Sequence, residues 1–285
     1  MRTIIKKTLH FMVTLIAFLA ITTGTSLAAE GINWDDSTIS ATGMGVAPPN
    51  ARNAAQARML ARRAAVVDAY RQLAESVNGV NVDSETTVEN MMVMNDSIKT
   101  KVSAVIKGAR VISEQITPDG GYEVTMQISL FGVSNSLASA IMPAPATKES
   151  FPAPIPNVTA SIPSGSSAAE APNGKPIGGY TGLVVDCRGL GLSPVMSPVI
   201  KNESGSPIYG YKNLDIDKVI SQGMAADTYD ITNAPRAGTN PLVVKAVRVD
   251  NHNANPVLSL ADANRVLIEN GATGFLDRTN VVFVR

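Results

Sequence analysis

The sequence predicts an α+β protein of two domains, each with helices packed on a mostly antiparallel sheet. Stretches with helical spacing of apolar residues and stretches with two-residue alternation follow one another in both halves of the chain. A proline-rich segment separates the halves, and hydrophobic residues make up 45% of the 285 residues. This content is enough for a hydrophobic core in each half.

Residues 1–28 have the layout of a secretory signal peptide. Arg2, Lys6 and Lys7 form a basic start, residues 11–21 are uncharged and mostly apolar, and small residues lead up to Ala28. The alternative is an uncleaved membrane anchor, which needs a longer apolar run of roughly 20 residues. We therefore predict cleavage after Ala28 and a mature protein that is periplasmic or peripherally associated with the envelope.

Composition limits the classes of function. The chain has 24 basic and 24 acidic residues. Removal of residues 1–28 takes away three basic residues and no acidic one, which leaves 21 against 24, a net charge of −3. This balance argues against nucleic-acid binding. The mature chain has no second long apolar segment, so we predict no transmembrane span in it. The single cysteine, Cys187, allows no intramolecular disulfide and lies far from the cleavage site, so we expect no lipid attachment through a cysteine.

The segment 143–176 is predicted to be a linker. It holds eight of the 17 prolines among alanine, serine and glycine, a composition that buries little apolar surface and stays extended. The predicted organisation is a signal peptide at 1–28, a first α+β domain at 29–142, the linker at 143–176 and a second α+β domain at 177–285.

In the first half, the pattern predicts a short strand at 37–46 and a long helix that Asn53 caps, with Gln56 three residues further on. The helix is expected to end at Asn78, with Gly79 in a left-handed conformation. Its inward stripe is predicted to consist of Met59, Leu60, Val66, Val67, Tyr70, Leu73, Ala74 and Val77.

Further along the first half, residues 80–88 alternate weakly and predict a strand, and a second helix is expected from Asp96 to a stop at Gly108. The clearest hairpin runs through 111–117 and 122–130, joined by the turn sequence Pro118-Asp119-Gly120-Gly121. Alternation along 122–130 predicts one buried face and one wet face.

The second half predicts another mixture of strands and helices. The expected strands are 183–187, 195–201, 207–211, 242–249 and 281–284, and the expected helices are 214–226, capped by Asp215, and one that Ser259 opens and Gly271 ends.

Nothing in the chain amounts to a catalytic signature, and we predict no catalytic, metal or cofactor-binding residues. His252 is the only histidine after residue 28 and is expected in an exposed loop. Cys187 is expected to be a buried small hydrophobe, although exposure beside Arg188 would lower its pKa. The pair Asp215 and Asp217 is better explained by helix capping than by calcium. The remaining carboxylate pair is Asp227 and Asp230, and the glycine-rich stretch 189–193 lacks the lysine of a phosphate loop.

The long helix carries a recognisable string, NAAQARMLARRAAVVDAYRQLAE, at residues 53–75. Together with Ala41-Thr42-Gly43-Met44-Gly45 upstream and Gly79-Val80 downstream, it resembles the bacterial twenty-kilodalton outer-membrane lipoprotein family. It is also similar to the N-terminal domain of flagellar assembly protein T. The resemblance covers roughly residues 37–132. It implies a non-enzymatic envelope module, attached to the outer membrane in the lipoproteins and part of a basal-body ring in the flagellar protein.

These observations lead to an exported, non-enzymatic envelope protein with a structural or assembly-accessory role. Its expected partners are other envelope proteins or further copies of itself. Arg58, Arg62 and Arg71 fall off the apolar stripe and are candidate contact residues, with ordinary helix solvation as the alternative. The alternative function is a periplasmic binding module, in the second domain, for a cell-wall fragment or small ligand. A hydrolase is the third hypothesis, which the scarcity of histidine, cysteine and aromatic residues disfavours.

Overall fold

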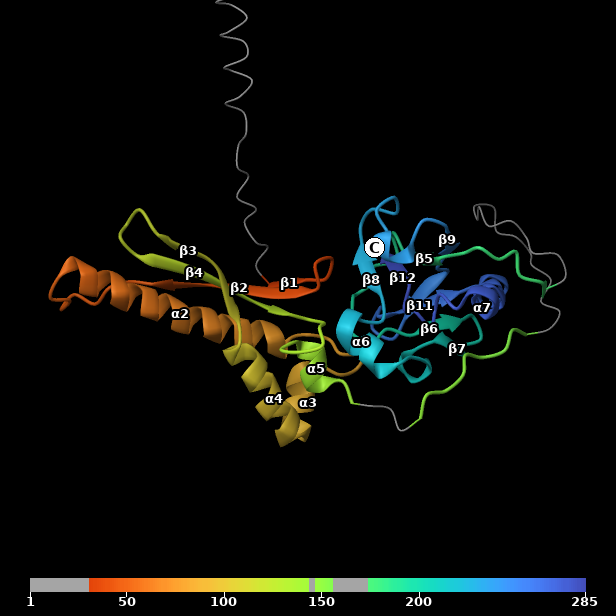
Figure 1. The fold of residues 1–285 in the computed structure, drawn as a ribbon, viewed down its shortest axis with the longest axis horizontal. Coiled ribbons are helices and arrows are strands. Elements are labelled where there is room, and N and C mark those ends of the chain that lie inside the picture. The colour runs from red at the N-terminus through yellow and green to blue at the C-terminus, as the bar shows by residue number, and fades with distance from the viewer. Residues whose placement is uncertain (1–30, 144–146, 156–173) are drawn as a thin grey trace, which may run out of the picture.

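The computed structural model describes residues 31–143, 147–155 and 174–285. The expected signal peptide and the cleavage site at Ala28 lie outside the described residues. Figure 1 shows two bodies side by side, a long first domain and a rounder second domain. Among the described residues, no helix has the length and apolar character that crossing a membrane requires.

The first domain is built on one antiparallel sheet with strand order β1-β2-β4-β3. Its strands are β1 (Gly31–Asn33), β2 (Thr38–Gly45), β3 (Arg110–Ile116) and β4 (Tyr122–Ser129). β2 pairs with β4 along its whole length, and β4 pairs with β3. The predicted strand at 37–46 and the predicted hairpin are both confirmed. The sheet therefore follows from local alternation and one strong turn.

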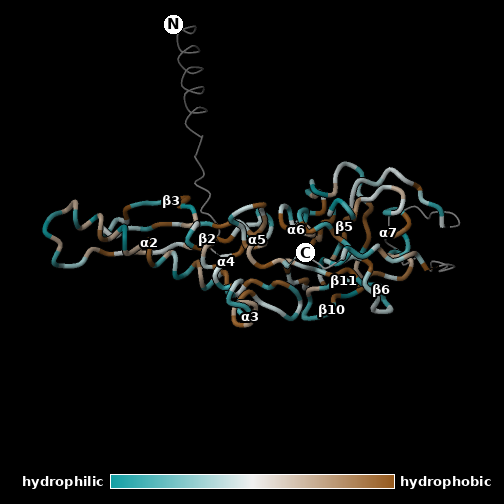
Figure 2. The backbone as a smooth tube through the Cα atoms, turned by 60° about the horizontal axis from the view of Figure 1, so that its bottom comes forward, coloured by the Kyte–Doolittle hydropathy of each residue, from teal (hydrophilic) through white to brown (hydrophobic). Residues whose placement is uncertain are grey.

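Helix α2 (Ala54–Asn78) covers one face of this sheet. Asn53 caps it by accepting a hydrogen bond from the backbone N–H of Gln56, as expected. The predicted inward stripe is wrong at Met59 and Val67, which are 73% and 63% exposed. It is confirmed at Leu73 and Val77, which are fully buried. The buried face consists of Ala61, Ala65, Ala69, Leu73 and Val77. Figure 2 accordingly shows short hydrophobic and hydrophilic pieces alternating along the helix.

The reason for an alanine face is the close approach of α2 to β2. A Cβ atom added to Gly43 would lie 2.1 Å from the backbone nitrogen of Ala69, and one added to Gly45 would lie 2.2 Å from the carbonyl oxygen of Ala61. Glycine on the strand and alanine on the helix therefore let the two backbones come together. Opposite these two glycines the helix face is alanine, and the larger Leu73 and Val77 are buried only further along the helix.

Three details after α2 differ from the sequence prediction. Gly79 closes the helix with φ −78°, so it is not left-handed. Residues 80–88 form no strand beyond a single bridge between Asn81 and Thr87. The short helices α3 (Val88–Met94) and α5 (Leu137–Ile141) were not predicted, whereas α4 (Asp96–Lys107) agrees with the expected helix.

The second domain contains a four-stranded parallel sheet with order β8-β12-β5-β9. Its strands are β5 (Gly182–Asp186), β8 (Ala226–Thr228), β9 (Pro241–Lys245) and β12 (Val281–Val284). β5 and β12 are buried along nearly their whole length, which is typical of central strands covered on both faces.

A second sheet of mixed direction has the order β10-β11-β6-β7. It consists of β6 (Ile200–Asn202), β7 (Pro207–Tyr209), β10 (Arg248–Asp250) and β11 (Asn255–Leu258). The predicted strand at 242–249 is divided between the two sheets. Ala246 donates to Asp186 beside β5, and the next residue, Val247, donates to Val257 of β11. The chain thus crosses from one sheet to the other within a run that looks continuous in sequence.

Two α-helices complete this domain. α6 (Ile216–Gln222) is capped by Asp215, as predicted, but it ends before the expected residue 226, because Ala226 begins β8. α7 (Leu260–Thr273) is capped by Ser259. α7 does not end at Gly271; it continues to Gly274, which closes it in the left-handed conformation at φ 65°. Two 3-10 turns, η2 (Tyr211–Asn213) and η3 (Pro235–Ala237), lie in the connections.

The predicted fold class, two α+β domains, is confirmed. The first domain has the expected antiparallel sheet. In the second domain, the sheet containing β5 is parallel, because its strands are connected by crossovers through α6, η3 and α7.

The two domains are joined by specific contacts. Met196 of the second half is 1% exposed and belongs to the hydrophobic core of the first domain. Its backbone N–H donates to Asn81, and that of Ser197 donates to Val82 at 2.7 Å. A second contact joins Gly132, before α5, to Ile220 of α6 at 2.8 Å. Side-chain packing and backbone hydrogen bonds therefore join the two domains around Met196 and around Gly132.

Part of the expected linker lies against the second domain. The side chain of Asn264 on α7 forms two hydrogen bonds with the backbone of Ile155, at 2.8 and 2.9 Å. Further along α7, the carboxylate of Glu269 accepts the backbone N–H groups of Ile177 and Gly178, both at 2.8 Å. The chain on either side of residues 156–173 is thus held by the same helix, at points roughly 7.5 Å apart along its axis.

Candidate functional site

The single cysteine has no catalytic environment. Cys187 is fully buried, which confirms the expectation of a small hydrophobe. Burial, together with the nearby charges of Asp186 and Asp227, raises the pKa of its thiol to about 12. Arg188 does not activate it, because its guanidinium binds both carboxylate oxygens of Asp186, at 2.9 and 2.7 Å. The thiol therefore stays protonated at neutral pH.

His252 lies in an exposed loop, as predicted, but it also contacts the other domain. Its Nδ1 atom is 2.9 Å from the carbonyl oxygen of Ser84 in the first domain. Asn251, His252 and Asn253 all have positive φ values between 53° and 63°. The loop thus presents the imidazole toward the first domain, a geometry that suits a docking contact.

The remaining sequence candidates have structural roles. Asp215 caps α6 by accepting the N–H groups of Asp217 and Lys218. Asp230 accepts the N–H and hydroxyl of Thr232, which lowers the pKa of Asp230. Gly189 and Gly191 redirect the chain with positive φ values. Within the described ranges, no group of three or more histidine, cysteine, aspartate or glutamate residues is placed to hold a metal ion.

Charged residues do converge at the carboxyl edge of the parallel sheet. Asp186 ends β5, Lys245 ends β9, Asp227 lies in β8, and Arg285 follows β12. The carboxyl edge is where open parallel sheets bind ligands. Asp227 and Arg285 form an ion pair at 3.5 Å, with side chains only 8% and 13% exposed.

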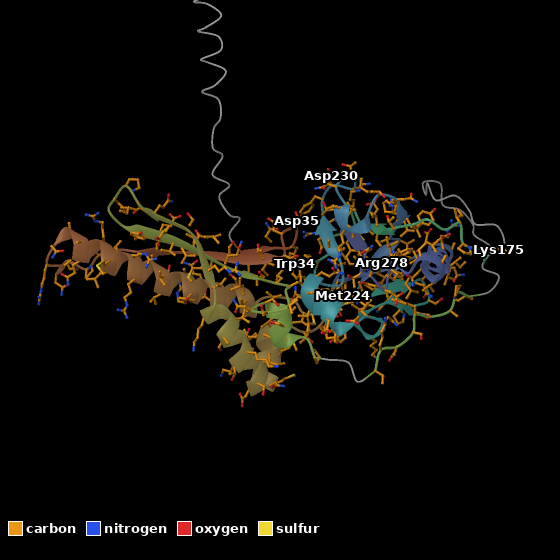
Figure 3. The ribbon with its side chains drawn as sticks, viewed as in Figure 1. Trp34, Asp35, Lys175, Met224, Asp230 and Arg278 are labelled. Carbon is orange, nitrogen blue, oxygen red and sulfur yellow. The ribbon has the colours of Figure 1, made fainter. Side chains whose placement is uncertain are left out.

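The first domain reaches this edge through the turn between β1 and β2. Figure 3 labels Trp34 and Asp35 at the end of the first domain that faces the second. Asp35 forms an ion pair with the Nη2 atom of Arg285 at 3.5 Å. The guanidinium of Arg285 also lies over the ring of Tyr229, 4.6 Å from its centroid. The edge is thus covered by a side chain from each domain.

This junction is incompletely hydrogen-bonded. The Oδ1 atom of Asp227 and the Nε atom of Arg285 are buried without a hydrogen-bond partner. Burial raises the pKa of Asp227 to about 6; Arg285 opposes the rise and Asp35 adds to it. Sequence reasoning considered Asp227 only as a partner of Asp230 and missed Asp35 and Arg285. No strand was expected at residues 226–228, so the sequence did not mark Asp227 as a buried charge.

A second buried ion pair lies on α7. Glu269 is fully buried and its Oε1 atom is 3.0 Å from the Nε atom of Arg265, whose Nη2 atom has no hydrogen-bond partner. The Arg265 guanidinium lies 6.0 Å from the ring centroid of Tyr180. Because Glu269 also accepts the N–H groups of Ile177 and Gly178, this pair fixes where the chain enters the second domain.

The three candidate contact arginines do not share one face. Arg62 binds Glu114 of β3 at 2.8 Å, whereas Arg71 binds Asp68 and Glu75 on α2 itself. Arg62 and Arg71 are nine residues apart, which places them roughly 180° apart around the helix at about 100° per residue. Arg58 lies one turn before Arg62 and is exposed. The structure therefore brings Arg58 and Arg62 together beside β3 and separates them from Arg71.

Strand β3 is an exposed edge. All seven of its residues are exposed, among them Val111 and Ile112 at 43% and Ile116 at 53%. Among the described residues, β3 pairs in the sheet with β4 alone, with a register shift between Val111 and Ser113. An edge strand with unpaired backbone groups and apolar side chains is a surface that can pair with another chain.

This architecture defines a two-domain α+β protein, in which a long first domain contacts a rounder second domain. Comparison with known families agrees with that division. Residues 40–129 match the LPP20 lipoprotein family, and residues 182–285 match the family of the second domain of Treponema pallidum Tp0624. The comparison with curated proteins gives no match.

The match over residues 40–129 confirms the resemblance to the twenty-kilodalton lipoprotein family. It points to association with the envelope. The one cysteine of the sequence, Cys187, is buried in the second domain, so it is not a site for a lipid.

Proposed function

We propose that this protein is an exported, non-enzymatic envelope component with a structural or assembly-accessory role, acting by protein–protein contact. The similarity to a lipoprotein family supports the envelope location and the absence of catalysis. Its placement is periplasmic or peripheral to a membrane. Its partners are other envelope proteins or further copies of itself, and a flagellar basal body is one assembly in which it would fit.

The observation that carries this proposal is the exposed edge formed by β3, which we call the β3 edge (Arg110–Ile116). Its side chains include Val111, Ile112 and Ile116, and it lies beside Arg62 through the ion pair to Glu114. A partner strand would satisfy the free backbone groups of the edge and bury its apolar side chains. Arg58 and Arg62 would supply charge at the rim, where charged residues mainly guide association.

The proposal can be tested with a photo-crosslinking residue placed at single positions in the tagged chain, expressed in its native host. We expect position 112 on the β3 edge and position 58 on α2 to give the same envelope-protein adduct. Position 93 serves as the matched control, because Val93 is 82% exposed and lies on α3, which Figure 1 shows apart from β3. Equal adducts from all three positions, or none from position 112, would contradict the proposal.

Charge-reversal variants test which of the three arginines contribute to the contact. The triple variant Arg58→Glu, Arg62→Glu and Arg71→Glu is expected to abolish the adduct while folding is retained, since exposed ion pairs contribute little stability. The geometry further predicts that Arg71→Glu alone leaves the adduct intact, because Arg71 lies on the far side of the helix from Arg62. An adduct that survives the triple change removes the arginines from the contact.

A second candidate function is binding of a cell-wall fragment or small ligand by the second domain. The observation in its favour is the carboxyl edge of the parallel sheet, where Asp186, Asp227 and Arg285 converge. Soluble peptidoglycan fragments would then raise the unfolding temperature of the chain, and less so in an Arg285→Gln variant. If no fragment changes the unfolding temperature, this second function is rejected and the assembly function remains.

A further inference from the structure

The turn between β1 and β2 and the carboxyl edge of the parallel sheet share one guanidinium. Arg285 Nη2 is 3.5 Å from Asp35 of the first domain, and Arg285 Nε is 3.5 Å from Asp227 of the second. The two carboxylates thus lie on either side of one cation. Asp35 is half-exposed, whereas Asp227 and Arg285 are buried, so water screens the two ion pairs unequally.

Arg236 of η3 also faces Asp227, and its positive charge favours the ionised carboxylate and lowers the pKa of Asp227. Its guanidinium is held in place by the carbonyl oxygens of Gln222, Gly223 and Thr279 at 2.6–2.8 Å, and no ion pair joins it to Asp227 within the described residues. The Cys187 thiol, after β5, is neutral. When both carboxylates are ionised, Asp35 and Asp227 compete for the guanidinium of Arg285. Asp227 Oδ1 and Arg285 Nε are buried without a hydrogen-bond partner.

We propose that Asp35, Arg285 and Asp227 form a proton-controlled latch between the two domains. Uptake of one proton by Asp227 leaves Arg285 to pair with Asp35 alone and tightens the hold on the β1–β2 turn. Loss of that proton restores competition for the guanidinium and repulsion between the carboxylates, and it loosens the turn. The rest of the domain joint, around Met196 and Gly132, is unaffected.

The direction of the effect follows from reciprocity. Asp35 adds to the rise in the pKa of Asp227, which burial brings to about 6. If the position of Asp35 favours the protonated form of Asp227, protonation of Asp227 must favour that position of Asp35 by the same free energy. The latch is thus tighter at pH 5 than at pH 7.5, with a midpoint near pH 6.

Trp34 is a built-in reporter, because it is the only tryptophan of the chain and precedes Asp35. We would measure quenching of its fluorescence by acrylamide, a neutral quencher, between pH 5 and pH 7.5 in the chain without residues 1–28. We expect the quenching constant to rise with pH around a midpoint near 6. Asp227→Asn should lose this transition and stay at the low-quenching level throughout.

Two controls keep the result specific. Asp230→Asn, three residues further along and bound to Thr232, should retain the wild-type transition. His252 contacts Ser84 of the first domain, so each variant is also measured with His252→Gln, which should leave the transition in place. A transition that persists in Asp227→Asn, or quenching that does not change with pH in the wild type, overturns the proposal.

A second measurement tests the coupling itself. The carboxyl-carbon resonance of Asp227 reports its pKa directly, and Asp35→Asn should lower that pKa because the repelling charge is gone. An unchanged pKa in Asp35→Asn would show that the two carboxylates are not linked through Arg285, and the latch would be rejected.

Discussion

Replacement of Gly43 by alanine is expected to disrupt the first domain more than any other single added methyl group that we consider. The new Cβ atom would lie 2.1 Å from the nitrogen and 2.7 Å from the Cα atom of Ala69, and 2.2 Å from the carbonyl oxygen of Ala65. All three are backbone atoms, so no side-chain rotation relieves the contact. To restore an ordinary distance of 3.4 Å to that nitrogen, α2 must shift away from β2 by about 1.3 Å.

The magnitude can be estimated from what this shift separates. Ala61, Ala65, Ala69, Leu73 and Val77 form the buried face of α2. A gap of about 1 Å forfeits a quarter to a half of the dispersion energy of the atoms involved. Overpacking alone costs typically about 1–3 kcal/mol. Since the clash involves backbone and the whole helix face, we expect a loss of about 3 kcal/mol or more, a large part of the stability of a single domain.

Urea unfolding followed by Trp34 fluorescence measures this effect on the correct domain, because Trp34 packs against the first-domain core. Gly79→Ala is the matched control: Gly79 has φ −78°, and an added Cβ would meet only ordinary contacts at 3.7 and 3.8 Å. Its unfolding free energy should stay close to the wild type. If Gly43→Ala also stayed within about 0.5 kcal/mol of the wild type, the reasoning from close helix–strand approach would be refuted.

Three further predictions concern buried groups. The pKa of Asp227 is raised to about 6 in the folded chain, so its ionisation lowers the free energy of unfolding as pH rises from about 4 through 6. In urea titrations, Asp227→Asn should therefore stabilise the protein by up to about 3 kcal/mol at pH 7.5 and should not stabilise it at pH 4. Glu269→Gln leaves the buried Arg265 unpaired and should cost about 3–5 kcal/mol in thermal unfolding, and a change below about 1 kcal/mol would contradict the assigned pairing. Met196→Ala should destabilise the first domain by about 2–4 kcal/mol although the residue belongs to the second half, and an unchanged Trp34 transition would show that the domain joint does not depend on this side chain.

The sequence predicted the elements that depend on neighbouring residues. Asn53, Asp215 and Ser259 cap the helices that they were expected to cap, and the hairpin around residues 118–121 is present. Each of these is a local interaction, in which a side chain or turn satisfies backbone groups two or three residues away. The match to the lipoprotein family covers residues 40–129, which include Asn53 and the hairpin.

Errors arose where a distant segment decided the outcome. Met59 and Val67 looked like core residues, but the glycines of β2 bring the strand so close to α2 that alanine occupies the buried face. Residues 242–249 were predicted as one strand, but hydrogen bonds to Asp186 and to Val257 place its two ends in different sheets. The candidate site was missed for the same reason, since Asp35 and Arg285 are 250 residues apart in the chain.

By itself, the sequence determined the two α+β domains, most of their helices and hairpins, and the family of the first domain. These follow from periodicity, capping and turn chemistry, which act over a few residues. Only the tertiary structure decided which face of α2 is buried, the parallel direction of the sheet around β5, and the sharing of Arg285 by Asp35 and Asp227. Those features depend on close approach and on unequal burial of charge, and both arise only when segments far apart in sequence meet.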